Sequence, residues 1–301
     1  MALSFSYEVK KEICKTPVGK ACCRTAELYG ILLYANTFSY HEIKIITANP
    51  YLKKRVMQLL KRVLNLEILP EEREKFIFSI ADQRIIRQIF DLLGYDFKPH
   101  VAYGLNRNII EEECCKAAFL RGAFLLAGTV AAPDKKCHFE IATSHQSLTR
   151  QVMALMMDMG FLPKLTERKG SAVIYFKDTA SVENILTLLG APVGAMSIME
   201  AKVEKGLRNE INRRVNCETA NLIKTTDAAA KQIVWIKKAI NKYGMALFPE
   251  SLRATVELRL ANPSASLAEL AMLSEEPITR SGLSHRLKKI LSIVKQNEDR
   301  L

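Results

Sequence analysis

An internal repeat is the feature of this sequence that most restricts its fold. The segment CCRTAELYG, residues 22–30, matches CCKAAFLRG, residues 114–122, with both cysteines, one alanine, one leucine and the glycine in register. After an insertion around Pro133–Lys136, the match runs without a gap from Ile45 against Ile141 to LLG at 92–94 against LLG at 188–190. Because chance similarity rarely keeps register over such a length, the chain contains a duplicated unit, with copies at about 20–95 and 112–191.

Each copy follows the pattern helix, strand, helix, strand, helix, in which the first helix contains Leu28 and Gly30 or their counterparts. We therefore expect an α+β domain over residues 1–205, made of two αβαβα halves related by a pseudo-two-fold axis. The expected strands are residues 42–47 and 76–80 in the first copy and 137–143 and 172–176 in the second; the amphipathic helices that follow them are 52–64, 84–93, 148–157 and 182–189.

Two glycines, Gly30 and Gly122, occupy matching places inside the first helix of each copy. A glycine inside a helix costs about 1 kcal/mol relative to alanine, so its presence needs a structural reason. A close approach of two helix backbones is such a reason. We expect the two first helices to cross at the pseudo-two-fold axis.

The segments LRGAFLLAG, residues 120–128, and LYGILLYAN, residues 28–36, resemble the LAGLIDADG helices of homing endonucleases. In that family the eighth motif position is an acidic residue that binds the metal ion at the scissile phosphate. Ala35 and Ala127 stand at those positions here. Without the carboxylates, the metal ions of phosphodiester cleavage have no ligands. The resemblance therefore implies a degenerate LAGLIDADG-like domain that is not an enzyme, against the rival hypothesis of a nuclease.

The expected strands also differ from those of a sheet that lies in a DNA groove, because they are apolar on both faces instead of alternating with basic residues. A protein-interaction or dimerisation role for this domain is at least as well supported as DNA binding. The apolar strand residues are Ile43, Ile45, Ile46, Phe76, Ile77, Phe78, Val173, Ile174 and Phe176.

Seven cysteines, an odd number, and no recognisable export signal indicate reduced thiols. The equivalent pairs Cys22-Cys23 and Cys114-Cys115 suggest either a redox or metal site or buried structural thiols. Adjacent helix residues point about 100° apart, so we expect at most one thiol of each pair to face a shared site. The preferred interpretation is buried thiols, with no metal and no cofactor.

A net charge of +12, from 44 Lys and Arg against 32 Asp and Glu, favours an anionic partner such as nucleic acid or an acidic membrane surface, although a merely basic protein would share this charge. Half of the excess follows Gly206, where 16 basic and 10 acidic residues occur. Charges at Glu8 and Lys10 interrupt any apolar signal segment, and no run is long enough to span a membrane. We expect a cytoplasmic, nucleoid-associated protein without a membrane partner.

Residues 206–247 are interpreted as a basic linker followed by a helix from about Thr219 to Tyr243, which Gly244 ends. This segment is either a connector or an additional contact with DNA. The residues proposed to contact phosphates are Arg208, Arg213, Arg214 and Lys224.

Residues 248–301 are predicted to form a helix-turn-helix domain of three short helices. Leu252, Val256 and Leu260 mark the first helix, and Ser266 with Glu269 forms a capping box at the start of the second. Thr279 can cap the third, whose apolar stripe is Leu283, Leu287, Ile290 and Val294. The opposite, polar face suits a recognition helix, although a solvated basic face would have the same pattern. Its proposed DNA-binding residues are Thr279, Arg280, Ser281, Ser284, His285, Arg286, Lys288 and Lys289.

The order of these features, with RRVNCETANLIKT at 213–225 and ITRSGLSHRLKKI at 278–290, closely resembles the WhiA family over essentially the whole chain. The resemblance implies a sequence-specific regulator that binds promoter DNA and acts in cell division, chromosome segregation or sporulation of Gram-positive bacteria. In part of that family a WhiB-type iron–sulfur protein acts as co-activator, which suggests a protein partner for the N-terminal domain. The alternative is a protein-interaction scaffold in cell division with auxiliary DNA binding.

Overall fold

The computed structural model describes residues 4–98 and 103–298. The chain divides into two compact units, residues 1–206 and residues 207–301. Each unit has its own buried apolar core, and each is described separately below. No helix of the described residues is both long enough and apolar enough to cross a membrane.

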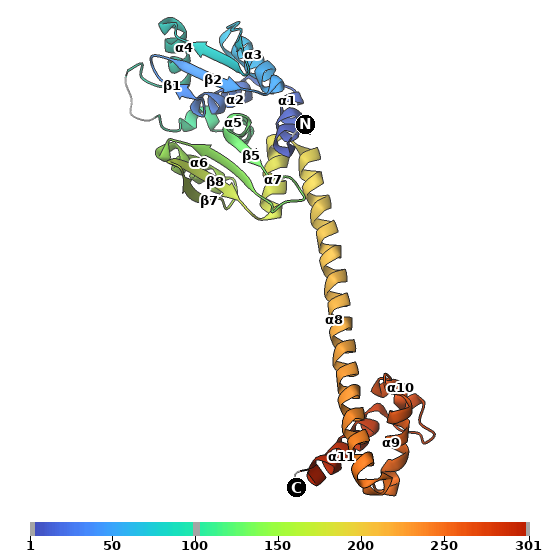
Figure 1. The fold of residues 1–301 in the computed structure, drawn as a ribbon. Helices are drawn as coiled ribbons and strands as arrows, with labels where there is room; N and C mark the ends of the chain where they lie inside the picture. The colour runs from blue at the N-terminus through green and yellow to red at the C-terminus, as the bar shows by residue number, and fades with distance from the viewer. Residues whose placement is uncertain (1–3, 99–102, 299–301) are drawn as a thin grey trace. The chain divides into compact units, whose positions relative to one another are not determined.

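The first unit is built from the predicted duplication (Figure 1). Each copy contributes one antiparallel sheet of the described residues, with strand order β1-β2-β4-β3 in the first copy and the equivalent order β5-β6-β8-β7 in the second. The elements of the first copy are α2 Ala21–Leu33, β1 Thr37–Phe38, β2 Ile43–Thr47, α3 Pro50–Leu64, β3 Glu71–Glu72, β4 Phe76–Ile80 and α4 Gln83–Leu93. Those of the second are α5 Glu113–Ala127, β5 Gly128–Val130, β6 Phe139–Thr143, α6 Gln146–Asp158, β7 Lys164–Arg168, β8 Ser171–Phe176 and α7 Thr179–Leu189, after the 3₁₀ turn η1 Arg107–Ile110.

The duplicated α+β architecture is therefore confirmed, and each copy has two additional short strands. Strand β3 consists of two exposed glutamates, and β7 has the largely polar sequence KLTER. Strands of this kind carry little apolar periodicity, because they lie at the sheet edge and bury few side chains. Their pairing with β4 and β8 is set by the hairpin and not by burial.

The first helices of the two copies, α2 and α5, cross in backbone contact, as the paired glycines predict. A Cβ atom on Gly30 would lie 2.1 Å from the carbonyl oxygen of Phe119, and one on Gly122 would lie 2.1 Å from that of Glu27. Both distances are far below van der Waals contact. The equality of the two contacts shows that the pseudo-two-fold axis passes between the two glycines.

A buried ion-pair network lies beside this crossing. The Glu27 carboxylate on α2 accepts two hydrogen bonds from the Arg55 guanidinium on α3, at 2.7 and 2.9 Å, and both side chains are 1% exposed. The remaining guanidinium nitrogen of Arg55, Nη1, donates a hydrogen bond to the Thr16 carbonyl oxygen at 2.6 Å. Arg121 on α5 approaches the same carboxylate at 3.4 Å and donates to the Leu189 carbonyl. The Glu27 carboxylate therefore forms ion pairs with Arg55 of its own copy and with Arg121 of the other copy.

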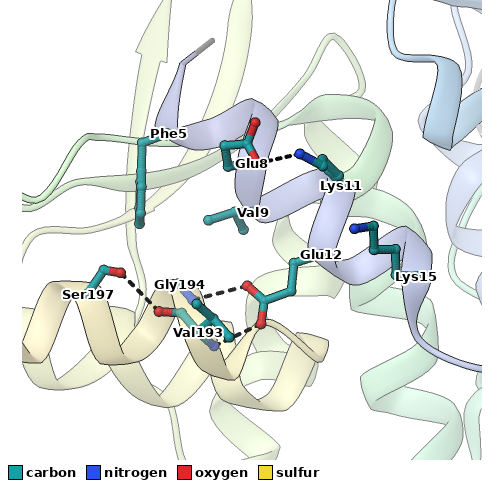
Figure 2. Close-up of a pocket in the computed structure, with 9 residues that line it drawn as sticks. All are labelled: Phe5, Glu8, Val9, Lys11, Glu12, Lys15, Val193, Gly194 and Ser197. Carbon is teal, nitrogen blue, oxygen red and sulfur yellow. Dashed lines mark hydrogen bonds and ion pairs between the residues drawn. The ribbon is translucent and has the colours of Figure 1, made fainter. Parts of the chain in front are cut away.

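Helix α1, Phe5–Lys15, fixes the start of helix α8, Pro192–Tyr243 (Figure 2). The Glu12 carboxylate accepts hydrogen bonds from the backbone amides of Val193 and Gly194, at 2.8 and 3.0 Å. These amides belong to the first turn of α8 and have no partner within the helix. A carboxylate at this place also interacts favourably with the helix dipole.

Replacing Glu12 with alanine is expected to destabilise the first unit by about 1 kcal/mol, because two helix-end amides lose their acceptor. For a unit of this size the midpoint of thermal unfolding should fall by about 2–4 °C. The matched control is Glu8→Ala, one turn earlier on α1, where the carboxylate makes an exposed pair with Lys11. Equal midpoints for the two variants would show that the contact with α8 contributes no stability.

Helix α8 departs from the sequence expectation over residues 206–218. These residues are helical and exposed, not a linker, and the helix expected from Thr219 begins at Pro192. Its end at Tyr243 is confirmed, and Gly244 follows with a φ of 74°. Leu207, Ile211 and Val215 recur every four residues in this stretch, so a helical pattern was present, but the expectation of a linker weighed the basic residues and not this periodicity.

The second unit packs three helices around the last turns of α8. Its core buries Ile236 and Ala239 of α8 together with apolar residues of every other helix in the unit. The remaining elements are the 3₁₀ turn η2 Met245–Leu247, α9 Glu250–Ala261, α10 Leu267–Met272 and α11 Arg280–Glu298.

Candidate nucleic-acid interface

Helix α11 is held in the second unit by the predicted apolar stripe. Leu283, Leu287, Ile290 and Val294 are at most 1% exposed, so one face of the helix is entirely packed. The Thr279 hydroxyl oxygen accepts a hydrogen bond from the Gly282 amide at 3.1 Å, which caps the helix as expected. The N-terminal half of α11 is therefore a rigid element.

Helix α10 begins with the predicted capping box. The Ser266 hydroxyl accepts from the Glu269 amide at 3.2 Å, and the Glu269 carboxylate accepts from the Ser266 amide at 2.7 Å. The hydrogen bonds from Ser266 lower the pKa of the Glu269 carboxyl, which favours its charged form. Helices α10 and α11 with the turn between them form the helix-turn-helix.

The exposed face of α11 carries most of the proposed recognition residues. Ser284 and Arg286 are half-buried, and the Arg286 guanidinium pairs with Glu276 at 3.1 Å, so this arginine is engaged within the unit. The exposed residues of the predicted set are Thr279, Arg280, Ser281, His285, Lys288 and Lys289.

A groove of about 390 Å³ lies next to this face, between α8, α9, α10 and the start of α11. Lys224 and Arg280 line it together with Ser266 and Gln232. The structure therefore brings one of the four proposed phosphate contacts of α8, Lys224, to the same place as Arg280, the first residue of the proposed recognition helix. Two cations in one groove suit a phosphate group.

The same groove is lined by a residue that sequence reasoning missed, Arg259. Its side chain is 2% exposed and donates to the Ala265 carbonyl at 2.7 Å, while its Nε atom has no partner among the described residues. Burial lowers the pKa of the Arg259 guanidinium. Arg259 takes the buried place expected for Leu260, which is half-buried, because position 259 lies nearer the face of Leu252 in a helix of 3.6 residues per turn.

The other proposed phosphate contacts do not reach this groove. Arg208, Arg213 and Arg214 are exposed on α8, and at a rise of 1.5 Å per residue they lie about 15–24 Å along the helix axis from Lys224. Arg213 donates to the Asn209 carbonyl of its own helix. These three arginines form a separate basic stretch.

The outer faces of the sheets in the first unit are of mixed character and not uniformly basic: Lys44 in the first sheet and Lys164 and Arg168 in the second lie beside apolar and acidic residues. In the second sheet, Glu140 lies on that face and binds His138 at 2.8 Å and Arg168 at 3.1 Å. In the first sheet, the half-buried Ile46 and Ile77 are cross-strand partners. A carboxylate and an apolar pair are poorly suited to a phosphate backbone.

The two positions that correspond to the acidic motif residues lie at the ends of the crossing helices. Ala127 is the last residue of α5, and Ala35 follows the end of α2 by two residues. Both are half-buried against the core. Across residues 4–98 and 103–298, three or more potential metal ligands come together at a single place, which is formed by cysteines and not by acids.

Comparison with known proteins finds a matching family model in each of the two units. The model of the WhiA LAGLIDADG-like domain matches residues 116–208, and the model of the WhiA C-terminal HTH domain matches residues 211–294. The probable cell division protein WhiA of Desulforamulus reducens is 34% identical over 96% of this chain and 94% of its own length. That of Desulforudis audaxviator is 33% identical over 97% of this chain and 96% of its own length.

Among solved structures, full-length DUF199/WhiA from Thermotoga maritima matches with a TM-score of 0.59 at 23% identity, covering 98% of this chain and 99% of that one. This likeness extends to both units and supports the same fold. The chain therefore belongs to the WhiA family, with a degenerate LAGLIDADG-like unit followed by a helix-turn-helix unit.

Proposed function

We propose that this chain is a sequence-specific DNA-binding transcriptional regulator that inserts the N-terminal half of α11 into the major groove. The observation that carries the proposal is the exposed polar and basic face of α11, from Thr279 to Lys289, on a helix whose opposite face is fully packed. Ser281 and His285 can reach base edges, and Lys288 and Lys289 can neutralise phosphates. The groove with Lys224 and Arg280 provides a further phosphate contact.

Relatives of this chain are named probable cell division proteins, which supports a role in division, and we propose the control of genes for division, chromosome segregation or sporulation. Binding to promoter DNA would locate the protein on the nucleoid. We propose further that the LAGLIDADG-like unit does not cleave DNA, since alanines stand at the two positions of the acidic residues. Supercoiled plasmid should remain intact with the purified protein and Mg²⁺ or Mn²⁺, and metal-dependent nicking would contradict this.

The double variant Lys288→Ala/Lys289→Ala should bind DNA more weakly, with a shallower dependence on salt. Each lost phosphate contact reduces the slope of log K against log salt by about 0.9, so the slope should fall by about two. Fluorescence anisotropy across a salt series measures both quantities, on duplexes that the unaltered protein selects from a random-sequence library.

The matched control for this experiment is Lys295→Ala, which removes an exposed lysine further along the same helix. It should bind with nearly unchanged affinity and slope. If the double variant and the control bind equally well, α11 is not the recognition helix.

A protein-interaction scaffold is the second candidate function. It is favoured by Leu207, Ile211 and Val215, which are spaced by four residues on α8 and are each more than half exposed. Apolar side chains that recur on one helix commonly mark a contact with a partner. A scaffold with auxiliary DNA binding would keep its cellular function in the Lys288→Ala/Lys289→Ala variant, whereas a regulator would lose it.

A further inference from the structure

Four cysteines converge where the two crossing helices begin. Cys22 and Cys23 lie in the first turn of α2, and Cys114 and Cys115 lie in the first turn of α5. The four sulfur atoms all lie within 4.8 Å of one another. The expectation that at most one thiol of each pair faces a shared site is therefore wrong.

The expectation failed because it treated each side chain as a fixed radial direction on one isolated helix. Where the two helices approach each other, the cysteines of both helices border the same space. Rotation about χ1 then turns both sulfur atoms of each pair toward that space. The Sγ atoms are 4.0 Å apart within the first pair and 3.9 Å apart within the second. Burial was also expected for all four, but Cys22 and Cys114 are exposed.

These distances match the ligand shell of one tetrahedral ion. With Zn–S bonds of about 2.3 Å, the edges of the sulfur tetrahedron are about 3.8 Å long. The two pairs already have this spacing, and the separations between pairs need to close by about 1 Å at most. A disulfide would need two sulfur atoms to approach to about 2.05 Å, a much larger displacement.

The placement of the cluster acts on its thiols in opposite directions: burial raises the pKa of Cys23 and of Cys115, whereas a hydrogen bond from the Cys115 thiol lowers the pKa of Cys22. Each pair lies at the N-terminal end of a helix, where the unpaired amides and the helix dipole stabilise negative charge. The pairs occupy equivalent positions in the two copies, so the pseudo-two-fold axis relates them and both helices contribute equally. Cys23 and Cys115 are buried behind the exposed Cys22 and Cys114, which leaves a path for an ion from solvent.

We propose that the cluster of Cys22, Cys23, Cys114 and Cys115 binds one Zn²⁺ ion as a tetrathiolate. Four thiol protons pass to solvent as four Zn–S bonds form, and the resulting site carries two negative charges at two helix N-termini. No change of oxidation state is involved. The ion cross-links the two copies of the repeat on the N-terminal side of the glycine crossing, and it acts independently of α11.

The test is metal binding by the full-length protein, purified and held under reducing, anaerobic conditions. Titration with Co²⁺ should produce the intense charge-transfer and visible bands of tetrahedral thiolate cobalt, saturating at one ion per chain. Zn²⁺ should then displace the cobalt and abolish the bands. Cys22→Ser should weaken Co²⁺ binding by at least about tenfold, because one of four ligands is lost.

The matched control is Cys217→Ser, which removes an exposed thiol on α8 outside the cluster and should leave the titration unchanged. Since Cys22 is exposed, its loss should not unfold the domain, and circular dichroism of the metal-free variant verifies this. Zn²⁺ should raise the midpoint of thermal unfolding of the unaltered protein and of Cys217→Ser by more than that of Cys22→Ser, because the stabilisation depends on the ratio of the Zn²⁺ concentration to Kd.

Three results would overturn the proposal. The first is a reduced, folded protein that takes up no cobalt. The second is a disulfide among these four cysteines in protein isolated with its thiols blocked at lysis. The third is more than one metal ion per chain at the cluster, which would indicate a polynuclear site.

Discussion

Replacing Gly122 with alanine should destabilise the first unit by about 3 kcal/mol or more, or prevent its folding. The new Cβ would lie 2.1 Å from the Glu27 carbonyl oxygen and 2.9 Å from the Ile31 amide nitrogen, both of which are backbone atoms. Overpacking a core commonly costs about 1–3 kcal/mol when side chains can move aside. Here α2 and α5 would have to separate, so the cost should reach or exceed the upper end of that range. Urea unfolding followed by circular dichroism measures the change.

The control for this substitution is Gly206→Ala, in the interior of α8. A Cβ atom at Gly206 would have no neighbour within 4 Å, so the alanine should stabilise the helix by up to about 1 kcal/mol. The same change of side chain should therefore have opposite effects at the two sites. A Gly122→Ala protein as stable as the original would show that the two helices do not cross as described.

A comparably large loss is expected for Glu27→Gln, which removes one charge of a buried network. Arg55 would keep its positive charge at 1% exposure without a carboxylate partner. Breaking a buried ion pair on one side commonly costs about 3–5 kcal/mol. Denaturant unfolding should show this loss, whereas Glu8→Gln, in the exposed pair with Lys11, should change stability by less than about 1 kcal/mol.

A double variant, Glu27→Leu with Arg55→Met, separates charge burial from packing. Replacing both members of a buried pair by apolar residues of similar size is often neutral. We expect the double variant to recover most of the stability that Glu27→Gln loses. If it is no more stable than the single variant, the network contributes through its shape and hydrogen bonds and not through its unpaired charge.

Much of the first unit could be predicted because the same order of helices and strands occurs twice in the sequence, so each copy supports the assignment of the other. Strand β4 falls at the expected residues 76–80, and helices α3 and α4 begin within two residues of expectation. Helix α1 was not predicted. The four additional strands were not predicted either, because they are two to five residues long, lie at the sheet edges in local hairpins and leave little apolar periodicity. The helical stretch of α8 after Gly206 was missed for a different reason, because its apolar residues Leu207, Ile211 and Val215 are exposed and stand among many charged and polar neighbours.

The candidate interface could be predicted in outline but not in detail. Capping by Thr279 and the apolar stripe of α11 follow from local sequence, and both are present. The pairing of Arg286 with Glu276 and the groove shared by Lys224 and Arg280 are tertiary features. Arg259 carried a weak signal, its spacing of seven residues from Leu252, but an arginine is rarely assigned to a core.

The buried charge of Glu27 has a further consequence for how such a domain can change over generations. The repeat aligns Glu27 with Phe119 and Arg121 with Tyr29. The contact between Glu27 and Arg121 therefore has a symmetry mate between Phe119 and Tyr29, whose ring centroids are 5.3 Å apart. In a symmetric homodimer, one mutation would alter both contacts at once. Joining the copies in one chain lets each half of the interface diverge by single substitutions, so an ion pair and an aromatic pair can occupy equivalent places.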